Sequence, residues 1–203
     1  MAIFSSMIML ATAALDQGLR QYRGLMEKGV NFWDKAKFLW IDSSIGSVVD
    51  YYVFKDYTGW FPYFYADGER ISYISLSPLS GDLPVVAWIV KEKRDNGLFA
   101  VVYYELPVYT KTWKELELDY ATGNYKKGSS LLLLDGVTDI DMEFYGLDAS
   151  RKKGEWSQDF DGSKRKSLPS TIKLTYVSAG KKQTLLFCIN TNSMRKSDYN
   201  EIM

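Results

Sequence analysis

The chain has 203 residues, enough for one domain with an appendage. Its 25 basic and 25 acidic side chains give a formal net charge of zero, which argues against nucleic-acid binding, since such proteins usually carry a basic excess. The absence of histidine excludes His-based triads, most catalytic zinc sites and the usual general base near neutral pH. The one cysteine, Cys188, cannot form an internal disulfide, and its apolar neighbours predict a small buried strand residue.

The first fifteen residues carry no charged side chain. As a helix they would span about 22 Å, short of the ~30 Å hydrocarbon core of a bilayer. Three interpretations stay open. The first is a secretory signal peptide, since Ala11-Thr12-Ala13 resembles a cleavage site, although the basic n-region is missing. The second is a buried core helix. The third is the rear part of a longer membrane helix. In the last case the membrane contacts are Ile3, Phe4, Met7, Ile8 and Leu10.

Apolar residues then recur every three or four positions from Leu15 to Trp40, with charged side chains on the opposite face. This pattern predicts one long helix over residues 2–43, with a bend at 29–31 as an option because Gly29 weakens a helix there. The stripe expected to face a sheet comprises Leu19, Tyr22, Met26, Trp33 and Trp40.

A second apolar line runs beside this stripe, formed by Leu25, Phe32 and Leu39. The three are spaced by seven, so they stay roughly aligned along a helix. The line either widens the core face or forms a seam for a neighbouring helix, and the second interpretation makes these residues candidate partner contacts.

From about residue 45 the apolar period changes from 3.6 to 2, which is typical of strands. Turn residues at Asp67-Gly68, Asn96-Gly97 and Ala179-Gly180 predict three hairpins. Residues 107–130 and 146–168 read as irregular connections, and the tail from residue 191 is polar. The strands are expected at 47–54, 60–65, 70–76, 84–92, 98–106, 131–134, 137–145, 171–177 and 183–189. The order predicts an α+β fold, with one long N-terminal helix packed on an antiparallel β-sheet built from hairpins.

Asp139, Asp141 and Glu143 alternate with apolar residues, so three carboxylates share one face of a strand. A divalent cation site is one interpretation, because Ca²⁺ prefers several carboxylate oxygens. The other is a solvated face paired with Lys173 on a neighbouring strand. We favour the second, since ordinary alternation explains the pattern without a ligand.

Two further patterns are weighed in the same way. The segment Asp159 to Ser163 looks like part of a calcium loop, but an EF-hand would need a glutamate where Leu168 stands, so an Asx-rich turn is favoured. A cluster of aromatic residues is formed by Tyr57, Trp60, Tyr63 and Tyr65. We favour ordinary core and cross-strand packing for them, and the alternative is an exposed surface that stacks on glycans or single strands.

No nucleophile–base pair, P-loop or dinucleotide-binding turn is recognisable. We therefore expect no enzymatic activity, no catalytic residue, no cofactor and no metal.

Four motifs occur in order in the second half of the chain. They are LLLDGV at 132–137, MEFYGLD at 142–148, GEW at 154–156 and LPSTIKL at 168–174. Together with the half-apolar, half-amphipathic N-terminal helix, this series resembles the minor pseudopilin of the J class of type II secretion systems, a type IV pilin-like protein. The resemblance covers the helix and residues 131–190, whereas 55–125 is not distinctive.

The resemblance implies a structural role in the pseudopilus tip complex, which initiates assembly for protein export. Its partners would be I- and K-type minor pseudopilins. Residues 1–15 would be the membrane part of the helix, residues 16–190 a periplasmic head and 191–203 a tail, with the protein in the bacterial inner membrane. The family's basic leader and its Phe-Thr-Leu-Leu-Glu-like start are absent, so we expect the helix to be truncated at its start. The alternatives are a minor pilin of a type IV pilus or DNA-uptake pseudopilus, and a secreted glycan- or protein-binding domain.

Overall fold

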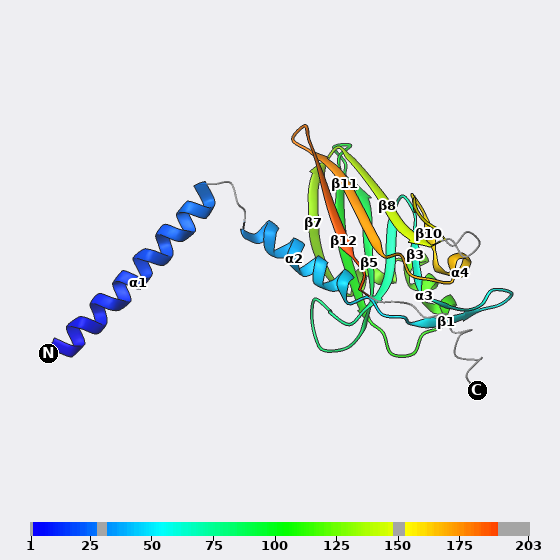
Figure 1. The fold of residues 1–203 in the computed structure, drawn as a ribbon, viewed down its shortest axis with the longest axis horizontal. Coiled ribbons are helices and arrows are strands. Elements are labelled where there is room, and N and C mark those ends of the chain that lie inside the picture. Colours follow the sequence, from blue (N-terminus) through cyan, green and yellow to red (C-terminus); the bar gives the residue numbers. More distant parts are fainter. Residues whose placement is uncertain (1, 28–31, 148–152, 191–203) are drawn as a thin grey trace. The chain divides into compact units, whose positions relative to one another are not determined.

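The computed structural model describes residues 2–27, 32–147 and 153–190, and Figure 1 shows its ribbon. The chain divides into two compact units, Met1–Trp40 and Ile41–Met203. Among the described residues, the first unit is helical and the second contains the strands, which pair antiparallel. The expected α+β class is therefore confirmed.

The N-terminal segment is helical on both sides of residues 28–31, as α1 (Ala2–Glu27) and α2 (Phe32–Gly46), over most of the range 2–43 expected to be helical. The position of the expected bend, 29–31, lies outside the described residues. The last turn of α2 belongs to the second unit, where Ile41 and Ile45 are buried.

The second unit contains three sheets. The largest has the strand order β10-β3-β4-β5-β6-β7, the next β12-β11-β8-β9, and the smallest pairs β1 with β2. The bounds of the strands are β1 (Tyr52–Lys55), β2 (Gly59–Pro62), β3 (Phe64–Ala66), β4 (Arg70–Ser75), β5 (Val85–Lys93), β6 (Phe99–Pro107), β7 (Ser129–Val137), β8 (Asp139–Leu147), β9 (Gly154–Ser157), β10 (Phe160–Asp161), β11 (Thr171–Ser178) and β12 (Lys181–Cys188).

The predicted hairpins at Asn96-Gly97 and Ala179-Gly180 are confirmed as β5–β6 and β11–β12. The turn at Asp67-Gly68 joins β3 to β4, but the strand expected over 60–65 is divided into β2, which pairs with β1, and β3. The strand expected over 47–54 begins only at Tyr52. Each turn uses the residues that the sequence indicated. Asp67 accepts hydrogen bonds from the amides of Glu69 and Arg70, and Gly97 has a φ of 79°. Gly180 likewise lies in the left-handed region, which glycine enters without a steric penalty.

The six-stranded sheet packs one face against the four-stranded sheet. Phe64 on β3 meets Phe144 on β8, with ring centroids 6.2 Å apart, and Phe160 on β10 at 5.5 Å. The last turn of α2 joins the same face, because the Ser75 hydroxyl donates to the Ser44 carbonyl over 2.8 Å.

The opposite face of the six-stranded sheet is covered by β1, β2, α3 (Trp113–Ala121) and the short 3₁₀ helix η1 (Asn124–Lys127). Residues 107–130 were expected to be irregular, and that expectation is wrong. Thr112 accepts a hydrogen bond from the Glu115 amide, while the Glu115 carboxylate accepts from the Thr112 amide. This reciprocal capping box starts α3.

Residues 146–168 were also expected to be irregular, but they contain β9, β10 and the short helix α4 (Gly162–Arg165). Phe160 is completely buried, so this segment contributes to the core. The expected break between strands at Asp135-Gly136 lies instead at Thr138, and β7 and β8 belong to different sheets.

Candidate interaction surfaces

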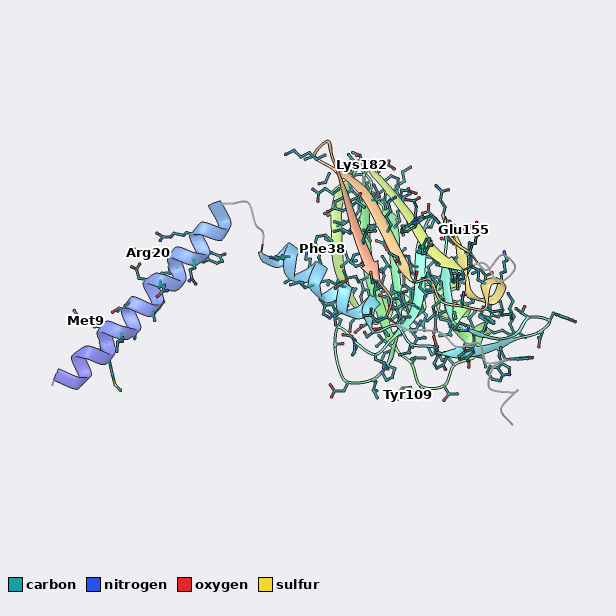
Figure 2. The ribbon with its side chains drawn as sticks, viewed as in Figure 1. Met9, Arg20, Phe38, Tyr109, Glu155 and Lys182 are labelled. Atoms are coloured by element: carbon teal, nitrogen blue, oxygen red, sulfur yellow. The ribbon has the colours of Figure 1, made fainter. Side chains whose placement is uncertain are left out.

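Helix α1 carries an uncharged apolar surface. Among the expected membrane contacts, Met7 is 66% exposed, Ile8 53% and Leu10 71%. Ile3 and Phe4 lie in α1, but their side chains are outside the described residues. Figure 2 shows Met9 standing out from this helix, and the first described ion pair follows only at Asp16–Arg20, over 2.6 Å. None of the helices, as far as they are described, is both long and apolar enough to span a membrane.

The stripe expected to face the sheet lies partly in α1. Leu19 and Tyr22 are 48% and 55% exposed. Trp40 is half-buried, and the side chains of Met26 and Trp33 are outside the described residues.

Within the second unit, the helical residues that contact the sheet are ones the stripe omitted. Ile41 and Ile45 are buried, and the Ser44 hydroxyl lies 3.2 Å from the Tyr73 hydroxyl. Burial raises the pKa of Tyr73, so this phenol stays protonated and acts as a neutral hydrogen-bonding group.

The candidate partner line is represented by Leu39, which is 63% exposed on α2. Leu25 lies in α1 and Phe32 in α2, but their side chains are outside the described residues. Leu39 is therefore the one member of the line whose side chain is described, and it is accessible to a partner.

The three acidic side chains of β8 share the outward face of the four-stranded sheet, as expected. Asp139 and Asp141 are exposed, while Glu143 accepts a hydrogen bond from Lys173 on β11 over 2.5 Å. Glu143 and Lys173 are direct cross-strand partners, so the proposed pairing is confirmed. No group of three potential metal ligands gathers among the described residues.

The other candidates divide between core and surface. Asp161 caps α4 by accepting from the Ser163 amide over 2.8 Å, which confirms the Asx-type turn. Tyr63 is buried and Tyr65 half-buried, whereas Tyr57 and Trp60 are exposed. The prediction for Cys188 is wrong, because this residue is exposed on β12 while its neighbour Phe187 is buried.

A buried charged network, not anticipated from the sequence, joins α3 to β4. Arg70 donates to Glu117 over 2.6 Å, and the Tyr63 hydroxyl donates to the other oxygen of the same carboxylate over 3.1 Å. Desolvation lowers the pKa of Arg70, but the hydrogen bond and charge of Glu117 outweigh it and the net pKa is raised. Burial, aided by the charge of Glu117, raises the pKa of Tyr63. Both raised pKa values favour the protonated forms of Arg70 and Tyr63, which donate the hydrogen bonds that join α3 to the sheet.

A second buried carboxylate, Glu105, borders a pocket of ≈ 380 Å³ together with Lys127 and Gly128. Its oxygens accept from the amides of Leu79 and Ser80 at 2.7 and 3.0 Å. The Tyr103 hydroxyl also donates to it over 2.9 Å. Because both oxygens are occupied from within the protein, Glu105 holds the loop after β4 in place and leaves no free acceptor directed at a ligand.

No protein-family model matches the chain, and no curated protein matches it.

Proposed function

We propose that this chain is a structural minor pseudopilin of the J class, with a pilin-like fold, which joins other minor pseudopilins at the tip of a type II secretion pseudopilus. The proposal includes an inner-membrane location with the head in the periplasm. It treats the protein as an assembly component without catalytic activity.

The observation that carries the proposal is the pairing of an exposed apolar helix with a separate α+β unit. The described side chains from Met7 to Leu15 are uncharged and exposed. Burying each large apolar side chain contributes roughly 1.5–3 kcal/mol, so such a helix favours an environment that covers it. Lipid or a bundle of similar helices supplies that environment, and helix packing then assembles the complex.

Leu39 on α2 supplies a second candidate contact. It is accessible on α2, which ends in the buried residues Ile41 and Ile45. The neighbouring core residues fix the last turn of the helix, and Leu39 remains available to a partner helix.

The test is co-purification of the full chain with the I- and K-type minor pseudopilins of the same genome, in detergent. We expect a complex that contains all three proteins. Leu39→Lys should weaken it at least tenfold while the melting temperature of the purified chain stays unchanged.

Leu118→Lys is the matched control, since Leu118 on α3 is 59% exposed and Leu39 63%. It places the same charge on a similarly exposed leucine of the head. A failure of the wild-type chain to associate at tens of micromolar, or equal losses from both substitutions, would contradict the proposed role.

A further inference from the structure

The β1–β2 hairpin has one face in the core and one in solvent. Val53 and Phe61 are each 2% exposed and pack beneath α3, whereas Phe54 and Trp60 are 52% and 51% exposed on the other face. Their ring centroids lie 5.6 Å apart at an interplanar angle of 62°. The hairpin projects from the body of the second unit (Figure 1).

Tyr57 stands at the tip of this hairpin, between β1 and β2, and is fully exposed. Its φ is 66°, a left-handed conformation that costs free energy for a bulky side chain. Glycine would make the same turn without strain. A strained, fully exposed tyrosine at a hairpin tip is a candidate for a contact outside the domain.

Contacts from two helices hold the hairpin in one conformation. Lys166, at the end of α4, donates its ammonium to the carbonyl of Thr58. Lys114 on α3 lies 3.8 Å from Asp56, and the Lys55 ammonium lies 4.1 Å from the ring centre of Trp113. A hairpin fixed in this way loses little conformational entropy on binding.

The geometry distinguishes between occupants. The β1–β2 hairpin projects from its unit (Figure 1), and it carries tyrosine and tryptophan, which are residue types that anchor protein interfaces in pockets. Phe54 and Trp60 are far from coplanar, so they do not form the flat platform that a sugar ring would stack on. The printed contacts of the hairpin involve three amines, those of Lys114 at Asp56, Lys55 at Trp113 and Lys166 at the Thr58 carbonyl, but one carboxylate, that of Asp56. A partner pocket with an acidic rim would complement this excess of positive charge.

We propose that the β1–β2 hairpin is a docking arm that inserts Tyr57, backed by Phe54 and Trp60, into an apolar, acid-rimmed pocket on the head of another minor pseudopilin. This inference rests on the proposed function and names a second contact, separate from the helical one. Three aromatic side chains, of which Tyr57 is fully exposed and the other two about half exposed, cover less than the roughly 800 Å² per partner of a standard interface. The arm therefore adds an anchor to a complex that the helices also hold.

The test measures binding of the full chain to the purified I- and K-type minor pseudopilins of the same genome by calorimetry. Tyr57→Gly removes the side chain and relieves the strained φ, so the melting temperature should stay the same or rise. We expect the affinity for one of the two partners to fall at least tenfold. Tyr109→Gly is the matched control, because Tyr109 is an exposed loop tyrosine and should bind as the wild type does.

Two further measurements test the composition of the contact. Trp60→Thr keeps a strand-forming residue at this position and should lower the affinity for the same partner. Raising the salt concentration should lower the partner affinity of the wild-type chain more than that of the Lys55→Gln variant, since the proposed pocket rim is acidic.

The outcomes separate the two proposals. If Tyr57→Gly binds as tightly as the wild type while Leu39→Lys does not, the docking arm is wrong and the proposed function stands. If the wild-type chain binds neither partner, the proposed function fails and the arm fails with it. Tyr57-dependent binding of a chitin oligosaccharide, or Tyr57-dependent self-association without partner binding, would overturn the arm by assigning it another occupant.

Discussion

The guanidinium of Arg70 on β4 is held by the carboxylate of Glu117 on α3 over 2.6 Å, between two aromatic rings. Its carbon lies 4.4 Å from the ring centre of Tyr65 and 3.8 Å from that of Tyr120. The Arg70 side chain is 7% exposed and that of Glu117 24%. A charged pair at this depth fixes the position of α3 on the sheet, because either charge left alone would be costly.

Glu117→Leu should therefore destabilise the protein strongly. The substitution leaves the Arg70 charge buried without its carboxylate, and breaking a buried pair in this way costs 3–5 kcal/mol, with about 3 expected here because Glu117 is partly exposed. Urea denaturation followed by tryptophan fluorescence measures the loss. Asp56→Asn is the control, since it breaks the exposed Asp56–Lys114 pair and should cost less than about 1 kcal/mol. Similar losses from the two variants would contradict this account of Arg70.

Glu92 makes part of the stability depend on pH. Desolvation raises its pKa, but the hydrogen bonds from Lys126 and Tyr104 and nearby positive charge outweigh this, and the net pKa lies below 4.5. The folded carboxyl therefore binds a proton less readily than the unfolded one. Its contribution is present above about pH 4.5 and is lost as the pH falls through the lowered folded pKa.

Lys126→Gln should raise the pKa of Glu92 and flatten this acid-side loss of stability. The Lys126 ammonium donates to Glu92 over 2.7 Å, so its removal takes away the leading favourable contact. The pKa is measured by NMR titration of the carboxyl, and stability by urea denaturation between pH 3 and 6. Lys127→Gln removes one positive charge as well, but at an exposed neighbouring position, and it should leave both measurements unchanged. An unshifted Glu92 in Lys126→Gln would show that the lysine is not the cause.

Gly128 lies so close to β6 that a side chain cannot be added. A Cβ there would stand 1.8 Å from the Glu105 carbonyl oxygen, and this backbone atom cannot move aside without a large cost in free energy. Gly128→Ala should cost about 3 kcal/mol or more, at or beyond the upper end for overpacking. Gly68→Ala is the control, because its Cβ meets nothing within 4 Å. Thermal unfolding of both variants checks the contrast, and a Gly128→Ala protein as stable as Gly68→Ala would refute it.

The sequence predicted best where structure is decided by neighbouring residues. Asn96-Gly97 between two apolar runs was sufficient to place β5 and β6, since the turn needs a positive φ that Gly97 adopts. The capping box of Thr112 and Glu115 was equally local, and it could have located α3. The apolar pattern does not indicate this helix, because α3 has little apolar periodicity and Leu116 is its one buried residue.

Features decided by distant residues could not be predicted in this way. Thr138 alone separates β7 from β8, yet β7 pairs with β6 and β8 with β11, and this choice of partners depends on tertiary packing. The Arg70–Glu117 contact joins residues 47 positions apart. Among the candidate surface aromatics, strand alternation separates exposed Trp60 from buried Phe61, but which face is buried depends on α3, whose position the sequence pattern did not indicate.

The acidic face of β8 yields a last prediction, concerning calcium. The Lys173 ammonium donates a hydrogen bond to the Glu143 carboxylate over 2.5 Å, and the remaining carboxylates, Asp139 and Asp141, are exposed. A native-state site with a Kd of about 0.1 mM would add about 2.3 kcal/mol at about 5 mM Ca²⁺. For a chain of this size that corresponds to a rise of roughly 5–9 °C in the melting temperature. We expect no such rise, because two exposed carboxylates supply too few oxygens and the third is neutralised by an amine. Differential scanning calorimetry with and without calcium measures it, with MgCl₂ at equal concentration as the control for ionic strength.

Lys173→Thr frees Glu143 at a cost below about 1 kcal/mol for a partly exposed cross-strand pair. A calcium response in this variant alone would identify the lysine as what prevents binding, whereas a response in the wild type would establish the cation site and contradict the assignment of this face as a solvated one.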